Sequence, residues 1–463
     1  MAPGQLSVFD LVVPETDEHP SFKALRTAPM SIAARWAVDQ AFGSFHDADG
    51  NFLQQLQSTG FDARFFELYL HAYFQYTGFT EDRKYTKPDF IVSCPAGTAA
   101  VEATTVNPST SGVLAQLGKK ISDLTRPEIF EYQRHELALR FGSPLFSKLQ
   151  KRYWEQEHCN GIPLVLAIEA FHDEQSLSFA DSALTSYLFG IKHEAEWDQE
   201  GKLRIEFDRI YEHVLGKKVV PSSFFDQPDT EYISAVMFTN SGTTAKFSRM
   251  GYQCGVGNDV LEMVRAGYCL NTDRDARDPT LFRYSLDNPP FAEPWGQGLV
   301  VIHNPKALRP LPHNFFPHSV QMVLKPEGPT SLTASWHPFT SKTMVFHLGE
   351  LKLKLKEASI GLTNQIAVGA ITKAEFRGVT GIPEPPGLRE EGWFCDDAQC
   401  FLGVLVFDIK DSDWGYIILA RDLAFQFRAI DMASSFATRT EAHEKLVFAI
   451  SSLVDKPQRL FPQ

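Results

Sequence analysis

The chain is poor in cysteine and has no long apolar stretch. It holds six cysteines in 463 residues, and no two of them have the C-x-x-C spacing of zinc and redox motifs. We therefore expect free thiols and a cytoplasmic protein, since reducing compartments keep cysteines unpaired. No run of about 18 apolar residues is present to cross a membrane. Met1–Pro14 lacks the basic start and apolar core of a secretory signal.

Basic charge is scarce as well. Lys and Arg number 44 against 57 Asp and Glu, which gives a formal net charge of −13. The surface as a whole therefore does not attract nucleic acid, and any such binding needs a local basic patch. A G-x-x-x-x-G-K-[ST] phosphate loop is also missing, so ATP hydrolysis is not expected. The length predicts two or three domains with sizeable cores.

Two acidic residues stand in a predicted strand–turn–strand segment. Asp89 opens a short apolar run, and Glu102 lies inside a second one, Val101–Thr105. A turn sequence containing Gly97 separates the two runs. Adjacent strands that bring carboxylates together form a site for a hard divalent cation with oxygen ligands. Because side chains alternate along a strand, Glu102 and Thr104 are expected on the same face.

A buried helix is predicted just before these strands, over residues 62–77. Asp62 is a suitable N-cap, and Gly78 is a suitable stop. Most of the helix circumference is apolar, and the polar positions form a narrow strip: Arg64, Glu67, His71 and Gln75. Such a strip needs partners, because an unpaired buried charge is costly. Glu67 is then either part of the acidic site or a simple partner of Arg64 or His71.

The segment after the strands predicts two helices and a buried strand. Helical sequence runs from residue 113 to 140, and Phe141-Gly-Ser-Pro144 predicts a sharp break. A second helix, 145–157, carries Lys148, Lys151 and Arg152 on one face at three- and four-residue spacing. The continuous apolar run 162–170 predicts a central strand.

This order of elements and acids resembles the PD-(D/E)xK nuclease superfamily between Phe61 and Ala170. The resemblance implies an α/β (α+β) fold with a restriction-endonuclease-like core: helix, mixed β-sheet, helix, strand. It also implies Mg²⁺ (or Mn²⁺) held by Glu67, Asp89 and Glu102, with phosphodiester hydrolysis as the reaction. The substrate it implies is nucleic acid, with DNA and endonuclease cleavage favoured.

The family's lysine, two positions after the second acid, is replaced here by Thr104. Several branches of the superfamily carry this lysine on the following helix, and Lys148 matches that placement. Lys151 and Arg152 would then bind the nucleic acid. The alternative is a degenerate nuclease fold that binds nucleic acid or a protein without cutting, which the threonine favours. A phosphoesterase acting on small molecules is the third interpretation.

The chain divides into three predicted parts. Residues 1–60 form an N-terminal helical arm, and residues 61–326 form the nuclease domain with extensions after residue 170. A linker at Lys325–Thr330 leads to a C-terminal α+β domain, 331–463, whose role the sequence does not define. That domain is a candidate surface for a second copy of the chain or for another protein. By analogy alone, a nuclease with an appended domain suits phage defence or DNA repair.

Overall fold

A computed structural model of the chain divides it into two compact units. Unit 1 comprises Met1–Gly257, Val264–Arg283 and Phe291–Met344, and unit 2 comprises Asn258–Met263, Tyr284–Pro290 and Val345–Gln463. The structure describes the following residues: 7–47, 49–107, 123–171, 181–215, 218–269, 271, 275–276, 279–326, 328–332, 336–347, 369–371, 388–395, 401–408, 413–421 and 427–454.

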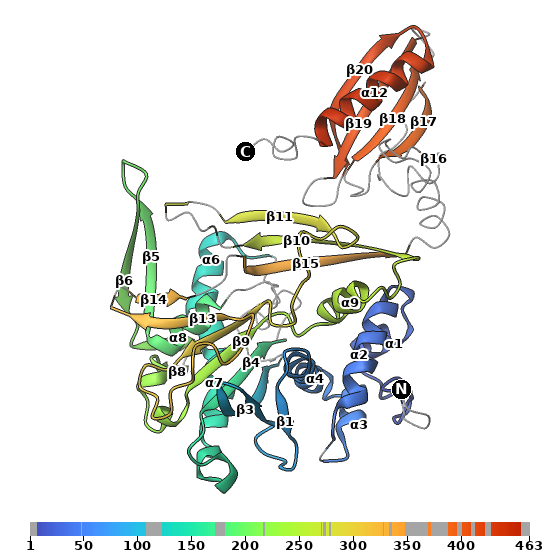
Figure 1. Ribbon diagram of the computed structural model, residues 1–463. Coiled ribbons are helices and arrows are strands. Elements are labelled where there is room, and N and C mark those ends of the chain that lie inside the picture. Colours follow the sequence, from blue (N-terminus) through green and yellow to red (C-terminus); the bar gives the residue numbers. More distant parts are fainter. Residues whose placement is uncertain are drawn as a thin grey trace. The chain divides into compact units, whose positions relative to one another are not determined.

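Unit 1 is built on an eight-stranded mixed sheet in the order β1-β2-β3-β4-β9-β12-β13-β14 (Figure 1). Its strands are β1 (Thr80–Asp82), β2 (Phe90–Cys94), β3 (Gly97–Val106), β4 (Leu164–Ala170), β9 (Ala235–Thr239), β12 (Leu299–His303), β13 (Val320–Lys325) and β14 (Gly328–Ser331). Strands β3, β4 and β9 are parallel neighbours, whereas β1, β2 and β3 form an antiparallel meander. The predicted α+β class is confirmed at this level.

Helices cover both faces of this sheet. Side chains of successive residues in a strand point to opposite faces, so each central strand contributes to two cores. Ala99, Val101 and Ala103 of β3 enter one core, which α4 (Phe61–Tyr76) and the N-terminal helices cover. Ala100 enters the other core, under α7 (Ala138–Leu149) and α8 (Ser182–Phe189). Glu102 shares the strand face of Ala100 and therefore faces α7. In Figure 1, α4 and α7 lie on opposite sides of β3.

The first sixty residues are mainly helical and pack on α4. They contain α1 (Pro20–Thr27), the short η1 turn (Pro29–Ser31), α2 (Ile32–Ser44) and α3 (Phe52–Gln57). Helix α2 also crosses α9 (Thr244–Gln253) at very close range, since a Cβ atom on Gly251 would overlap the carbonyl of Ala33. Only glycine permits this backbone contact.

The remaining elements of the larger part of the chain are peripheral. A short helix, α6 (Arg126–Glu131), and a π-helical segment (Tyr132–Leu137) lead into α7. Two antiparallel strand pairs follow α8: β5–β6 (Ile191–Trp197, Leu203–Arg209) and β7–β8 (Glu212–Leu215, Lys218–Pro221). A further three-stranded sheet has the order β11-β10-β15 (Thr280–Ser285, Leu261–Cys269, Pro338–His347). The first part of the predicted helix 113–140, up to residue 122, lies outside the described residues.

The predicted break at Phe141–Pro144 is wrong. Helix α7 runs without interruption from Ala138 to Leu149, with Pro144 inside it. A proline in a helix interior removes one hydrogen bond and costs about 3 kcal/mol. Phe141 and Leu145, on either side of the proline, are both fully buried under the sheet, and this continuous packing outweighs the lost bond. The predicted helix 145–157 also ends early, at Leu149, and two 3₁₀ turns follow (Tyr153–Glu155, Glu157–Cys159).

The predicted linker at Lys325–Thr330 is also wrong. Lys325 is the last residue of β13, Gly328, Pro329 and Thr330 belong to β14, and Lys325 pairs with Gly328 across the hairpin. Gly328 has a φ of +108°, a backbone conformation open to glycine. A proline- and glycine-rich segment therefore marks a tight turn at the edge of the main sheet here, not a boundary between domains.

Unit 2 contains an antiparallel sheet in the order β16-β17-β18-β19-β20. The strands are Gly369–Ile371, Leu388–Cys395, Phe401–Asp408, Asp413–Arg421 and Phe427–Phe436, and α12 (Arg439–Val454) packs on β18, β19 and β20. Leu405 and Ile418 of the sheet and Leu446 of the helix are buried. The alternating apolar and basic sequence of residues 351–356, which predicts a half-exposed strand with one cationic face, lies outside the described residues. Among the residues that are described, no helix is long and apolar enough to cross a membrane.

Candidate active site

Asp89 and Glu102 face one another at the start of β2. Phe90 pairs with Val101 in the antiparallel β2–β3 hairpin, so the residue before Phe90 lies opposite the residue after Val101. The backbone N–H of Asp89 donates to Oε2 of Glu102 at 3.1 Å. In return, Oδ2 of Asp89 accepts from the N–H of Ala103 at 2.7 Å. The two acids predicted from the sequence are therefore brought together by the strand register itself.

Glu102 is the most deeply buried of the predicted site residues, with 3% of its surface exposed. Its Oε1 atom accepts from Nζ of Lys148 at 2.5 Å and from the hydroxyl of Tyr153 at 2.6 Å. Lys148 comes from the last turn of α7, the helix that covers the strand face of Glu102. Thr104, one strand repeat further on the same face, is partly exposed. The cation nearest to Glu102 thus comes from the helix.

Glu67 projects from α4 and is held by Arg64 on the same helix. The Arg64 guanidinium donates to both carboxylate oxygens, at 2.7 and 3.0 Å, and to the side chain of Gln55 at 2.6 Å. Glu67 also lines a hollow together with Asp89. Glu67 thus pairs with Arg64, and it also lies beside the acids of the strands.

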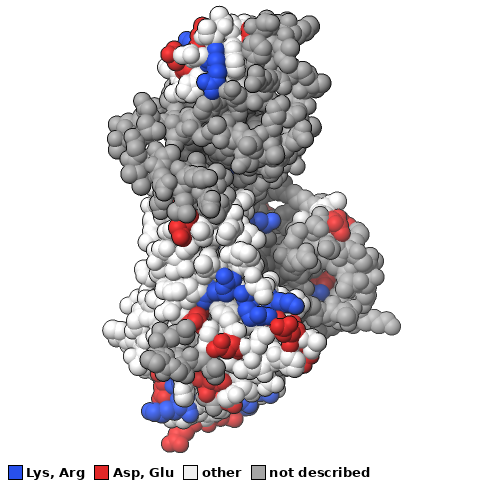
Figure 2. All heavy atoms as spheres, turned by 90° about the vertical axis from the view of Figure 1, so that its right-hand side faces the viewer, with Lys and Arg blue, Asp and Glu red and all other residues white. Residues whose placement is uncertain are grey.

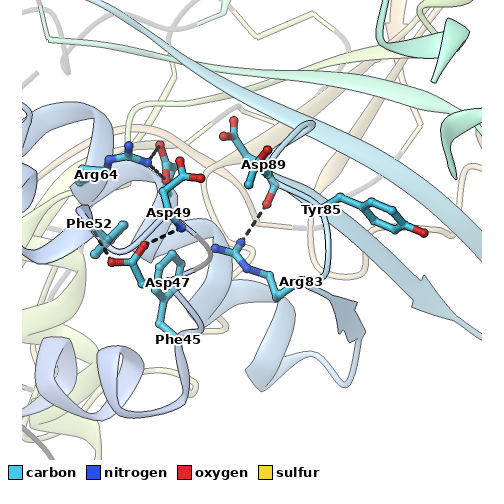
Figure 3. A pocket seen from close by; sticks show the side chains of 10 residues that line it. Phe45, Asp47, Asp49, Phe52, Arg64, Arg83, Tyr85 and Asp89 are labelled. Atoms are coloured by element: carbon cyan, nitrogen blue, oxygen red, sulfur yellow. Dashed lines mark hydrogen bonds and ion pairs between the residues drawn. The ribbon is translucent and has the colours of Figure 1, made fainter. Parts of the chain in front are cut away.

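The hollow is formed by two loops, one before α3 and one before β2 (Figure 3). It holds a cavity of about 30 Å³, open to solvent, and these residues line it: Phe45, Asp47, Asp49, Phe52, Arg64, Glu67, Arg83, Tyr85, Thr86 and Asp89. Asp47 shapes the first loop by accepting from the backbone N–H groups of Asp49, Gly50 and Phe52. This volume is far below that of ligand sites, and it has room for one or two water molecules or a single ion.

Arg83 joins the two loops. Its guanidinium lies between two aromatic rings, 4.4 Å from the centroid of Phe45 and 4.7 Å from that of Phe90. It donates to the carbonyl of Asp89 at 2.9 Å (Figure 3). It also donates to the carbonyl of His46 at 3.2 Å. Arg83, Asp47 and Tyr153 were not predicted from the sequence. Arg83 lies only six residues before Asp89, but an arginine in a polar loop gives no sequence signal of this contact.

Burial and neighbouring acids raise the pKa values of Asp89 and Glu67. Burial, and then the neighbouring charges of Glu102 and Glu67, raise the pKa of Asp89 well above its usual range, although Lys148 and the Ala103 N–H oppose the change. Burial likewise raises the pKa of Glu67, against the opposing charge of Arg64. Burial and the Glu102 charge also raise the pKa of the Tyr153 hydroxyl. A bound cation would relieve the repulsion that these raised pKa values reflect.

The donor chemistry fits a hard divalent cation, but the carboxylates are largely engaged. Across the described ranges, no three His, Cys, Asp or Glu side chains are gathered closely enough to hold a metal ion. Glu102 uses both oxygens in hydrogen bonds, and so does Glu67. Asp89 uses Oδ2, which leaves its Oδ1 as the oxygen best placed to accept a new ligand. Mg²⁺ and Mn²⁺ prefer such oxygen donors.

Lys151 and Arg152 do not continue the helical face of Lys148, because α7 ends at Leu149. Lys151 is exposed in the turn that follows. Arg152 has a left-handed backbone, with a φ of +50°, and its guanidinium pairs with Glu155 at 2.7 Å and with Asp229 at 3.0 Å. The expected row of three basic side chains is therefore replaced by one lysine bound to a buried acid, one exposed lysine and one paired arginine.

A second polar array lies one helical turn from Glu67. His71 contacts Oγ of Ser44 through Nε2 at 2.9 Å and Oε1 of Glu81 through Nδ1 at 2.8 Å. The order Ser–His–Glu matches that of a hydrolase triad. Ser44, however, is the last residue of α2, and its hydroxyl also donates to Ala41. The partial negative charge at a helix C-terminus opposes a developing alkoxide, so this array is better explained as a link between α2, α4 and β1.

Comparison with known proteins adds no further assignment. The chain matches no protein-family model, no curated protein and no solved structure.

Proposed function

We propose that this protein is a metal-dependent nuclease that hydrolyses phosphodiester bonds of nucleic acid, with DNA favoured. The observation that carries the proposal is the contact of Lys148 with Glu102, directly opposite Asp89. It joins two strand acids and a helix lysine, the set that the resemblance to PD-(D/E)xK nucleases requires. The order of α4, β2, β3, α7 and β4 supports a restriction-endonuclease-like core.

In this proposal Asp89, Glu102 and Glu67 hold Mg²⁺ or Mn²⁺, which would activate a water molecule and neutralise charge on the phosphate. The protein's own groups prepare the site. Lys148 and the Tyr153 hydroxyl fix the orientation of Glu102, and Arg83 fixes the backbone of Asp89. Lys148 also places a positive charge beside the acids, where it can stabilise negative charge in the transition state.

The competing proposal is a binding module that does not cut. The engagement of both oxygens of Glu102 favours it, as does Thr104 in the position of the family's lysine. In either case we propose a cytoplasmic protein whose C-terminal unit contacts a partner protein or a second copy of the chain. A role in phage defence or repair is also part of the proposal.

A cleavage assay separates the two. The purified full chain is incubated with supercoiled plasmid and with single-stranded circular DNA, in Mg²⁺, in Mn²⁺ and in EDTA. We expect cleavage only with metal, and none from Glu102→Gln, which keeps the size of the side chain but removes its charge. Glu157→Gln is the matched control, since Glu157 is exposed in the turn after α7. Binding without any cleavage in either metal would replace the nuclease with the binding module.

A further inference from the structure

Two stacked aromatic rings, those of Tyr85 and His158, lie at the edge of the hollow. The rings of Tyr85 and His158 stack with centroids 3.8 Å apart and planes 7° apart. The imidazole Nε2 of His158 also lies 2.8 Å from the carbonyl of Lys87, across a sequence separation of 71 residues. The loop that leads into Asp89 thus meets the turn that follows Lys148. The stack is held in place from both segments.

Tyr85 remains accessible in spite of this stack. Its residue surface is 40% exposed, and it lines the same hollow as Asp89 and Glu67. In the view of Figure 3 its ring points away from Arg64 and Asp47, beyond Asp89. An exposed ring that is already fixed in orientation loses little conformational entropy when a ligand stacks on it. The edge of the hollow therefore presents the exposed face of the Tyr85 ring next to Asp89 and Glu67.

A second aromatic pair nearby shows the contrast. Trp154 and Tyr232 stack with centroids 4.7 Å apart, and the Arg152 guanidinium lies 5.5 Å from the Trp154 ring. Trp154 is therefore covered by a ring and by a cation, and it offers no comparable face. Tyr85 has His158 on one side only among these contacts.

Two lysines flank Tyr85 in its own loop. Lys84 and Lys87 are both exposed, and Lys151 is exposed in the turn directly after α7, seven residues before His158. The Lys84 side chain is 81% exposed, and its nearest carboxylate, that of Asp82, is 3.7 Å away. On the face shown in Figure 2, by contrast, basic and acidic side chains lie in small mixed groups without a broad basic area. Aromatic rings interleaved with lysines are the pattern that binds single-stranded nucleic acid.

We propose that Tyr85, backed by His158, stacks on an unpaired base, so that the substrate is single-stranded nucleic acid or a strand with unpaired bases at the cleavage site. This inference rests on the proposed function. A base inside a duplex is stacked on both neighbours, and it meets a protein ring only after it leaves the helix. Lys84, Lys87 and Lys151 then contact the phosphates on either side of that base.

The test measures binding without cleavage. Glu102→Gln protein in EDTA is titrated into fluorescein-labelled oligothymidine of about 15 nucleotides and, separately, into a blunt duplex of the same length, with fluorescence anisotropy as the readout. We expect the single strand to bind at least about tenfold more tightly, and Tyr85→Ala to lose about 5- to 100-fold of that affinity. Tyr85→Phe and Tyr85→Trp should keep it, because stacking needs only the ring. An oligouridine of the same length shows whether RNA is accepted.

The matched control is Tyr211→Ala, because Tyr211 is 80% exposed and lies outside the lining of the hollow. It should bind as the parent does, and thermal melts should show all variants folded. Unchanged single-strand affinity in Tyr85→Ala, or a preference for the duplex, overturns the inference even if the wild-type chain cuts DNA with Mg²⁺. If Tyr85 contributes to single-strand binding as expected but no metal supports cleavage, the nuclease proposal is wrong. The proposed single-strand binding site at Tyr85 is then retained.

Discussion

The Nζ atom of Lys148 lies 2.5 Å from Oε1 of Glu102, although 46 residues separate them in the chain. The strand places Glu102 on the face of the sheet that α7 covers, and the last turn of α7 delivers the lysine. This ion pair therefore links Glu102 of β3 to α7, the helix packed on that face of the sheet. The predictions below begin with this pair.

Lys148→Ala should reduce cleavage by about 10²- to 10³-fold, the usual loss when one electrostatic stabiliser is removed. It should also lower the stability of the chain by about 2 kcal/mol, because the buried Glu102 loses a hydrogen bond from a charged, partly exposed donor. Thr104→Lys in the Lys148→Ala background should recover part of the rate, since Thr104 shares the strand face of Glu102. Lys151→Ala should weaken DNA binding and flatten its salt dependence while retaining the chemical step. Normal cutting by Lys148→Ala would end this account of the site.

Asp89→Asn tests, through pH, the cost of a buried Asp89 charge beside Glu102 and Glu67. Since the pKa of Asp89 is raised in the folded protein, the folded state binds more protons than the unfolded chain. Stability should then fall as the pH rises from about 4 through the raised pKa, by about 1.4 kcal/mol for each pH unit between the two. Asparagine keeps an oxygen for the Ala103 N–H and removes the charge. In EDTA, the melting temperature of Asp89→Asn should therefore exceed that of the wild type increasingly toward alkaline pH. Parallel pH profiles for the two proteins would contradict the raised pKa of Asp89.

Arg64→Met should tighten the binding of Mn²⁺ severalfold. The variant removes a positive charge from the hollow and releases both oxygens of Glu67, which Arg64 now occupies. Isothermal titration of Mn²⁺ at constant ionic strength measures the change. Arg26→Met is a suitable control, because Arg26 forms a similar pair with Glu18 away from the lining of the hollow. Weaker Mn²⁺ binding in Arg64→Met would mean that Arg64 positions Glu67 as a ligand.

Tyr153→Phe should lower stability by about 1.5–3 kcal/mol, the range for a hydrogen bond to a charged group. It should also slow cleavage, because Glu102 loses one of the two groups that orient it. Tyr73→Phe is the matched control: its hydroxyl donates to the carbonyl of Pro317 at 2.9 Å, in a core that does not touch Glu102. Tyr73→Phe should destabilise the chain while cleavage per folded molecule stays unchanged. Equal rates for the two variants would assign Tyr153 a purely structural role.

Sequence patterns predicted those parts of the fold that depend on local periodicity. The predicted helix 62–77 corresponds to α4 (Phe61–Tyr76), and the apolar run 162–170 contains β4 (Leu164–Ala170). The proximity of Asp89 and Glu102 was expected from the strand–turn–strand pattern. These inferences use residues close together in the chain, where a repeat of two or about 3.6 residues decides the conformation. The placement of Lys148 beside the acids, by contrast, came only from the resemblance to the PD-(D/E)xK superfamily.

Features that depend on distant contacts were predicted poorly. Pro144 is typical of a helix start, yet the buried faces of Phe141 and Leu145 keep α7 continuous. Tyr153 falls within the predicted helix 145–157, but it lies in a 3₁₀ turn, and its hydroxyl donates to Glu102. Arg83 gave no signal at all, because its partners Phe45 and His46 belong to a segment that was predicted to be a separate arm. Tertiary packing decides all three.

Arg83 contacts Phe45 of the N-terminal segment and Phe90 of β2, so the surroundings of Asp89 depend on the first sixty residues. A protein shortened by its first sixty residues would still carry every acid of the nuclease-like motif and the lysine as well. It would nevertheless lack Phe45, Asp47, Asp49 and Phe52, which form one wall of the hollow. The acids and the hollow around them are thus separable: a fragment with all of the acids would lack one wall of the hollow and the His46 contact of Arg83 beside the Asp89 loop.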